Sequence, residues 1–306
     1  MLPITIIGCG YVGTRLAVQI KQLAPSLLGV VHSESSARHL QALGITARPM
    51  DLDNNPSPAV DGHWVFYFAP PSPTGHSDQR IGHWLHSLAN QRPAKVVLIS
   101  TTGVYGDCGG RWITESAPIN PQTDRACRRV DAERQLQQWC DARQVPYAIV
   151  RVPGIYGPRR LPRERLERRL PVLAEAESPY SNRIHVDDLI RACLAAASED
   201  FSGVVHVSDG HPSTMTDYFN RVADALGLPR PEQISREEAR QILSREMQSY
   251  LAESKRMDIT RMRTGLGVEP DYPDLDLGLS DCVASEKRSE RNIAGVVTES
   301  NINNKK

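Results

Sequence analysis

The first thirteen residues place three glycines directly after a short apolar run. Residues 4–7 are typical of a buried strand, and Gly8, Gly10 and Gly13 follow in the spacing G-x-G-x-x-G. The first glycine allows a tight turn, the second lets backbone approach a pyrophosphate, and the third lets the next helix pack on the strand. That helix directs its amide groups at the same point. The spacing predicts a dinucleotide-binding turn, and the alternative is a purely structural glycine turn.

Composition narrows the class of protein. The 306 residues contain 36 basic and 36 acidic side chains, which argues against a nucleic-acid partner or a membrane surface. No apolar run is long enough to span a bilayer. The six cysteines show neither C-x-x-C nor metal-ligand spacing, so we expect reduced thiols, no metal site and a cytoplasmic protein.

Strands and helices alternate through the first half of the chain, which predicts an α/β fold with a doubly wound parallel sheet of the Rossmann type. We expect strands over residues 4–7, 27–31, 47–50, 65–68, 95–100 and 147–152. We expect helices over residues 11–23, 36–43, 78–90 and 123–143.

The pattern is less regular after residue 155. We expect helices over 187–197, 213–226 and 236–252, and a strand over 204–207. These features predict three parts. They are an NAD(P)-binding domain over 1–155, whose sheet can recruit later strands, a smaller substrate-binding part over 156–280, and a polar tail over 281–306 that is expected to be disordered.

Four further motifs follow in order along the chain. They are S-T-T-G-V-Y-G at 100–106, T-E-S-A-P at 114–118, R-V-P-G-I-Y-G-P at 151–158 and R-I-H-V-D-D at 183–188. With the glycine turn, they resemble an extended short-chain dehydrogenase/reductase of the NAD-dependent epimerase/dehydratase family. The G-x-G-x-x-G spacing is most similar to its atypical YeeZ-like branch. The resemblance covers residues 4 to about 279.

The resemblance implies a set of cofactor-binding residues. The pyrophosphate would contact Gly8, Cys9, Gly10, Tyr11, Val12 and Gly13, the adenine would lie beside Asp51 and Leu52, and Ala69 and Pro70 would flank the adenine-side ribose and pyrophosphate. Ser100 would lie near the nicotinamide ribose and Pro153 near the nicotinamide ring. Thr101 would orient the substrate oxygen.

The end of the second strand bears on the choice between NAD and NADP. An acidic residue there binds the ribose hydroxyl of NAD, whereas an arginine accommodates the 2′-phosphate of NADP. His32 and Ser33 occupy this position, and Ser36 and Arg38 follow. These donors favour NADP slightly, while Glu34 argues for NAD.

The acid/base pair that the resemblance leads one to expect is missing. Family members carry Tyr-x-x-x-Lys on the helix after the fifth strand, but no tyrosine occurs between Tyr105 and Tyr147 and no lysine between Lys95 and Lys255. Residues 127–131 stand in that region, and an arginine there cannot act as a base. Either another group supplies the proton, with Tyr105, Glu115 and Cys127 as candidates, or no acid/base step occurs.

A dense run of arginines follows the Tyr156-Gly157-Pro158 turn. It comprises Arg159, Arg160, Arg163, Arg165, Arg168 and Arg169. The resemblance places this run at the mouth of the substrate cleft, so Tyr156, Arg159 and Arg160 are predicted to bind substrate. Guanidinium groups suit phosphates and carboxylates. The alternative is a solvated helix, and for Tyr105 and Tyr156 the alternative is loop packing.

Together these features favour an oxidoreductase or epimerase that acts on an anionic small molecule such as a sugar nucleotide. The missing pair supports the alternative of a non-catalytic NAD(P)-binding protein with a redox-sensing or regulatory role. The resemblance also suggests a homodimer that forms through the helices expected over 78–90 and 123–143.

Overall fold

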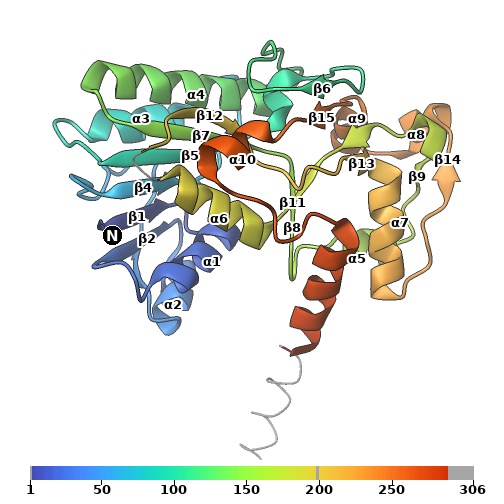
Figure 1. Cartoon of the computed structure of the whole chain (residues 1–306), viewed down its shortest axis with the longest axis horizontal. Coiled ribbons are helices and arrows are strands. Elements are labelled where there is room, and N and C mark those ends of the chain that lie inside the picture. Colours follow the sequence, from blue (N-terminus) through green and yellow to red (C-terminus); the bar gives the residue numbers. More distant parts are fainter. Residues whose placement is uncertain (1, 198–199, 289–306) are drawn as a thin grey trace, which may run out of the picture.

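A seven-stranded parallel sheet forms the centre of the computed structural model, which describes residues 2–197 and 200–288 (Figure 1). Its strands are β1 (Ile4–Ile7), β2 (Leu27–Val31), β3 (Thr46–Pro49), β4 (Trp64–Tyr67), β5 (Lys95–Thr101), β7 (Tyr147–Val152) and β12 (Gly203–His206). They lie in the order β12-β7-β5-β4-β1-β2-β3, so the chain reverses its winding between β1 and β4. The predicted doubly wound Rossmann-type fold is confirmed, and β12 joins the sheet from beyond residue 155.

Both faces of the sheet are covered, which explains why its strands are apolar on both sides. Helices α1 (Tyr11–Ile20), α2 (Glu34–Ala42), α6 (Val186–Ala196) and α10 (Thr260–Leu266) cover one face. Helices α3 (Gln79–Ser87) and α4 (Asp124–Arg143) cover the other, where Trp84 and Leu136 are buried.

The second part of the chain has small cores of its own. One lies between α5 (Arg163–Glu167), α7 (Met215–Leu226) and the helix formed by residues 275–288. Another lies under α8 (Arg236–Ile242) and α9 (Arg245–Leu251). The remaining elements are β6 (Trp112–Ile113), β8 (Gly154–Tyr156), β9 (Val172–Leu173), β10 (Tyr180–Ser181), β11 (Arg183–His185), β13 (Ser213–Thr214), β14 (Gln233–Ile234), β15 (Arg256–Met257), η1 (Thr102–Tyr105) and η2 (Glu175–Glu177).

The two parts interleave. Strand β15 pairs with β6 in parallel, and α10 packs against α6 and β12. Asn182 connects the same region, because its amide donates to the carbonyl of Lys255 and accepts from the amide of Met257. Residues of both halves of the chain also line one cavity, which is described below.

Two expectations about the C-terminal region are corrected. The helix expected over 236–252 is divided in two, because Leu243 is extended and Ser244 caps α9 by accepting a hydrogen bond from Met247. The tail was expected to be disordered from residue 281, but residues 281–288 continue the helix that begins at 275, and Cys282 is fully buried. Residues 289–306 lie outside the described part of the chain. Among the described helices, none is long and apolar enough to cross a membrane.

Candidate functional site

The glycine turn joins β1 to α1 with almost no room for side chains. Gly8 has a φ of +80°, and a Cβ there would lie 2.4 Å from the amide nitrogen of Ala69 at the end of β4. A Cβ at Gly13 would lie 3.0 Å from the side chain of Ile6. At Gly10, by contrast, the nearest atom to an added Cβ is a backbone oxygen at 4.0 Å. The turn is thus closely packed against the sheet at Gly8 and Gly13, and at Gly10 it is open at the carboxyl edge of the sheet.

Helix α1 begins at this opening without a side-chain cap. Its N-cap residue is Gly10, so no side chain receives the amide hydrogens of the first turn, which also lack partners within the helix. Tyr11 and Val12 open the helix and are half-buried. Cys9 points into the core, where burial raises the pKa of its thiol to about 12. A pyrophosphate fits this arrangement of free amide groups.

A cavity of about 580 Å³ lies between the starts of α1 and α2. It is lined by Cys9, Gly10, Tyr11, Thr14, Arg15, Ser35, Ser36, His39, Leu40, Pro158, Arg159, Ser285 and Glu286. Ser33 does not line it, since its hydroxyl caps α2 by accepting from Ser36, and His32 is exposed outside it. The two predicted residues therefore lie beside this cavity, and their neighbours Ser35 and Ser36 face it.

The predicted adenine-side residues follow β3 and β4. Hydrogen bonds from Asn54 and from the amide of Asp53 hold the pKa of Asp51 below its usual value. Leu52 and Ala69 are buried in the core between the sheet and helices α3 and α4. These residues lie at the carboxyl edge of the sheet, because β3 and β4 run parallel to β1 and β2.

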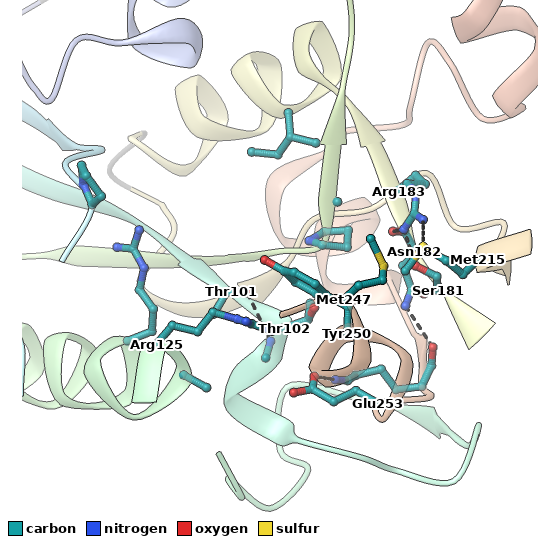
Figure 2. A pocket seen from close by; sticks show the side chains of 18 of the residues that line it. Thr101, Thr102, Arg125, Ser181, Asn182, Arg183, Met215, Met247, Tyr250 and Glu253 are labelled. Carbon is teal, nitrogen blue, oxygen red and sulfur yellow. Dashed lines mark hydrogen bonds and ion pairs between the residues drawn. The ribbon is translucent and has the colours of Figure 1, made fainter. Parts of the chain in front are cut away.

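The main cavity has a volume of about 700 Å³ (Figure 2). Its walls are formed by Pro70, Pro71, Ser72, Pro73, Thr101, Thr102, Gly103, Arg125, Ala126, Arg128, Arg129, Pro153, Gly154, Ile155, Tyr180, Ser181, Asn182, Arg183, Met215, Tyr218, Met247, Tyr250, Glu253 and Lys255. Three of the predicted site residues, Pro70, Thr101 and Pro153, meet here at the ends of β4, β5 and β7.

Thr101 and Ser100 are adjacent but point to different places. The Thr101 hydroxyl oxygen accepts a hydrogen bond of 3.2 Å from the amide of Gly103, which leaves its proton free to donate to a ligand in the cavity. Ser100 is buried and donates to the carboxylate of Glu133. The Ser100 hydroxyl is therefore occupied inside the core, and the place of Ser100 near a ribose stays a prediction, whereas Thr101 lines the cavity as its predicted role requires.

Three arginines of α4 line the cavity. Arg128 is only 9% exposed and donates a 2.6 Å hydrogen bond to the carbonyl of Gly75, but its Nε has no partner in the described structure. Arg129 donates long hydrogen bonds to the carbonyl oxygens of Ala69 (3.5 Å) and Ile99 (3.3 Å), and burial lowers its pKa. Arg125 stands four residues before Arg129, so the two share one helix face. Cys127, one of the candidates for supplying the proton, does not line the cavity.

The opposite wall adds two more cations. Arg183 donates to the carbonyl of Asn182 at 2.7 Å, and burial lowers its pKa. Lys255 forms an ion pair of 2.6 Å with Glu253. The lining thus holds five basic side chains and one carboxylate. Within the described ranges, no carboxylate forms an ion pair with Arg128, Arg129 or Arg183, although Asp78 interacts with Arg129 and Asp209 with Arg183 at longer range. The lining therefore carries more positive than negative charge.

Tyr105 does not reach the cavity, and its predicted catalytic role is corrected to a structural one. Its hydroxyl is buried, lies 2.6 Å from Nε2 of His206 and accepts a 2.6 Å hydrogen bond from Arg151. Burial raises the pKa of Tyr105 to about 12. Arg151 in turn pairs with Glu133 at 2.7 Å, and Glu115 accepts from the amide of His206. Tyr105 and Glu115 are parts of a buried polar network.

The predicted substrate-binding residues also lie elsewhere. Tyr156 is fully buried against Gly278, in the core of the second part. Arg159 lines the smaller cavity, and Arg160 stacks 5.0 Å from the ring centre of Tyr11. The two arginines therefore lie beside the glycine turn and not at the main cavity. The hydroxyl of Tyr11 donates a 2.9 Å hydrogen bond to the carbonyl of Pro158, which joins the loop before these arginines to α1.

One group of potential metal ligands lies outside both cavities. His185, Asp187 and Asp281 bring one ligand atom each within 4.8 Å of one another. The ring of His185 caps α6 by accepting from the amide of Asp187, while Arg15 binds both carboxylate oxygens of Asp187. Burial lowers the pKa of His185. These contacts make the group an ion-pair and capping network at the start of α6.

The comparisons with known sequences point to one family. The sequence model of the NAD dependent epimerase/dehydratase family matches residues 4–207. A 3-diazoavenalumate denitrifying reductase of a Streptomyces species is 30% identical over 107 residues, 35% of this chain and 35% of that protein. A human dTDP-D-glucose 4,6-dehydratase is 29% identical over 133 residues, 40% of this chain and 38% of that protein. The matches thus span little more than a third of these relatives.

Solved structures of other proteins share the fold of this chain over more than nine-tenths of its length. A conserved protein of unknown function from Silicibacter pomeroyi is 27% identical, with a TM-score of 0.78 over 92% of this chain and 98% of the other. A UDP-glucuronic acid 4-epimerase from Bacillus cereus in complex with NAD shares the fold, with a TM-score of 0.73 over 94% and 99% of the two chains and 16% identity.

Proposed function

Because the chain belongs to the NAD-dependent epimerase/dehydratase family, we propose that it binds NAD or NADP and acts on an anionic small molecule as an oxidoreductase or epimerase. The turn at Gly8, Gly10 and Gly13 supports this proposal, because it leaves space and free amide groups for a pyrophosphate. From this turn the dinucleotide would extend along the carboxyl edge of the sheet to Pro153. When bound, it supplies or accepts a hydride.

We propose NADP as the preferred dinucleotide. The smaller cavity beside the glycine turn offers the hydroxyls of Ser35 and Ser36, the ring of His39 and the guanidinium group of Arg159, while Arg15 in the same lining is already paired with Asp187. Such donors suit a 2′-phosphate. Glu286 is the carboxylate in this lining, and its Oε1 already accepts from the amide of Arg159.

The observation that carries the anionic substrate is Arg128. A guanidinium that is nine-tenths buried, with an unpartnered Nε and no carboxylate beside it in the described structure, is costly unless a ligand supplies the missing acceptor. The cavity volume of about 700 Å³ is within the range of small-molecule sites. A sugar nucleotide fits both the size and the charge, and the UDP-glucuronic acid 4-epimerase provides a neighbour of the same fold.

A non-catalytic, redox-sensing role is the second candidate. It is favoured by residues 127–131 on α4, which contain neither tyrosine nor lysine although the resemblance leads one to expect the acid/base pair there. Binding of a dinucleotide without turnover of any substrate is its distinguishing property.

The test is substrate-dependent oxidation of NADPH and NADH over a panel of sugar nucleotides and charged carbonyl compounds. We expect turnover with at least one anionic compound, and a loss in Thr101→Ala because the hydroxyl at the end of β5 orients the substrate oxygen. Thr264→Ala, an exposed change on α10, is the matched control. Binding of dinucleotide with no turnover across the panel would favour the sensing role.

We also propose a cytoplasmic homodimer. Its six cysteines are unpaired, as in a reducing compartment. Helices α3 and α4 pack side by side, and Leu85, Trp139 and Arg143 line a shallow groove between them. A molar mass near 68 kDa by light scattering, twice about 34 kDa, is expected, and Trp139→Glu should give the monomer mass.

A further inference from the structure

A carbonyl oxygen that becomes a hydroxyl needs a proton, so a reductive site must hold a group that can donate one. Arginine cannot serve, because its guanidinium stays charged. Besides the aliphatic hydroxyls of Ser72, Thr101, Thr102 and Ser181, the side chains that can exchange a proton around the main cavity are Tyr180, Tyr218, Tyr250, Glu253 and Lys255.

Tyr180 and Tyr218 belong to the wall formed by Ser181 and Arg183, and Glu253 and Lys255 form an ion pair. Tyr218 is 8% exposed and stacks 4.2 Å from the guanidinium carbon of Arg183, and burial raises its pKa. Glu253 and Lys255 neutralise each other across 2.6 Å. The ring of Tyr180 lies against Gly110 and under a guanidinium at 4.6 Å. Ser181, Asn182 and Arg183 mark this wall in Figure 2, away from Thr101.

Tyr250 differs from them in both position and surroundings. It lies in the last turn of α9, one turn after Met247, and both side chains enter the cavity between that wall and Thr101 (Figure 2). Its ring stacks on Arg125, whose guanidinium carbon lies 4.0 Å from the ring centre. This contact fixes the ring at the start of α4. Tyr250 is 45% exposed, so water can reach it.

The start of α4 is in turn packed against the turn that carries Thr101. A Cβ at Gly103 would lie 3.6 Å from the Thr101 hydroxyl oxygen and 3.8 Å from the Cβ of Ala126, the residue that follows Arg125. Thr101, Gly103, Ala126, Arg125 and Tyr250 therefore form one continuous stretch of the cavity wall.

We propose that Tyr250 is the proton donor of the reaction, brought by α9 to the cavity and held there by Arg125. This inference rests on the proposed oxidoreductase function. In the reductive direction the carbonyl carbon gains a hydride from the reduced dinucleotide. The carbonyl π bond breaks, and the oxygen takes the phenolic proton of Tyr250. The phenolate then recovers a proton from water at the cavity mouth. In the oxidative direction the phenolate oxygen of Tyr250 accepts the proton of the substrate hydroxyl.

The test compares wild type, Tyr250→Phe and Tyr272→Phe with the substrate found in the panel. Phenylalanine keeps the ring on Arg125, so we expect unchanged thermal stability and an unchanged Kd for NADPH by fluorescence. We expect kcat/KM for the reduction to fall by about a hundredfold, the lower end of the range for general acid catalysis. We also expect the fall in rate at high pH, which reports deprotonation of the donor, to disappear. Tyr272 lies outside the main cavity, and its replacement should leave kcat/KM within twofold of wild type and the pH–rate profile unchanged.

The outcomes separate the two proposals. Turnover by wild type with full activity in Tyr250→Phe overturns the assignment of Tyr250 and leaves the proposed function standing. NADPH binding without turnover of any compound overturns both. A loss in Tyr250→Phe that comes with a weakened NADPH Kd also overturns the assignment, because it shows a role in holding the dinucleotide.

Discussion

Replacing Arg128 by methionine tests whether the main cavity is built for an anion. Methionine keeps the apolar stem of the side chain but removes the guanidinium of Arg128, a residue that is 9% exposed and lines the cavity from α4. We expect two consequences: a clear loss of affinity for an anionic ligand, and little change in the free energy of unfolding.

The affinity loss can be estimated from one hydrogen bond. The unpartnered Nε of Arg128 can donate one bond to an anion, and bonds to charged groups contribute about 1.5–3 kcal/mol. This loss corresponds to a roughly 10- to 100-fold rise in Kd. Stability should change little. The variant loses the bond to the Gly75 carbonyl but no longer buries a cation with an unpaired N–H, and these effects are each about 1–3 kcal/mol and of opposite sign.

The assay is calorimetric titration with UDP, an anionic probe that lacks the reactive group, together with urea unfolding of each variant. Arg134→Met, an exposed change on the same helix, is the control. We expect the Kd for UDP to rise in Arg128→Met alone, while its free energy of unfolding stays within about 1 kcal/mol of wild type.

Two results would refute this reasoning. One is an unchanged Kd for UDP in Arg128→Met. The other is a loss of stability above about 3 kcal/mol, the size expected when a buried charge pair is broken, which would make Arg128 a structural support of the Gly75 loop.

Three further predictions concern stability. Glu133→Ala leaves the buried Arg151 without its partner and should lower the unfolding free energy by about 3–5 kcal/mol in urea titrations; a loss below 1 kcal/mol contradicts this. Burial raises the pKa of Asp209 to about 7, so the folded protein keeps a proton that the unfolded chain has released. Its contribution is present below about pH 4 and is lost as the pH rises to 7, so Asp209→Asn should gain stability relative to wild type over this interval, and parallel pH curves would contradict it. Gly8→Ala places a Cβ 2.4 Å from the amide nitrogen of Ala69 at a φ of +80° and should lose about 2–4 kcal/mol, whereas a wild-type melting temperature would refute the close approach.

The central sheet was predictable because its strands are buried on both faces and read as apolar runs. The boundaries of β1, β2 and β7 agree with the expected ranges, and those of β3, β4 and β12 shift by a single residue. The break between α8 and α9 was not found, although Ser244 is a good helix-capping residue. A charged amphipathic pattern continues across the break and concealed it.

The site was harder to predict than the fold. Tyr105 and Tyr156 belong to motifs of the resembling family, but a motif does not say whether a hydroxyl faces a cavity or the core. Tyr250 belongs to none of the quoted motifs. It lies 125 residues after Arg125 in the chain, and folding alone brings the two together. No local signal could have paired them.

The glycine turn at Gly8, Gly10 and Gly13 is the basis of the proposed dinucleotide binding, and a fluorescence titration with NADPH and NADH tests that binding. Wild type should bind both, NADPH more tightly, with a saturable change in the emission of the reduced nicotinamide. Gly10→Ala is the decisive variant, because its Cβ meets open space, 4.0 Å from the nearest atom, and projects where the pyrophosphate must approach. We predict that Gly10→Ala folds like wild type and loses binding. Wild type that binds neither dinucleotide, or Gly10→Ala that binds like wild type, would contradict dinucleotide binding at the glycine turn.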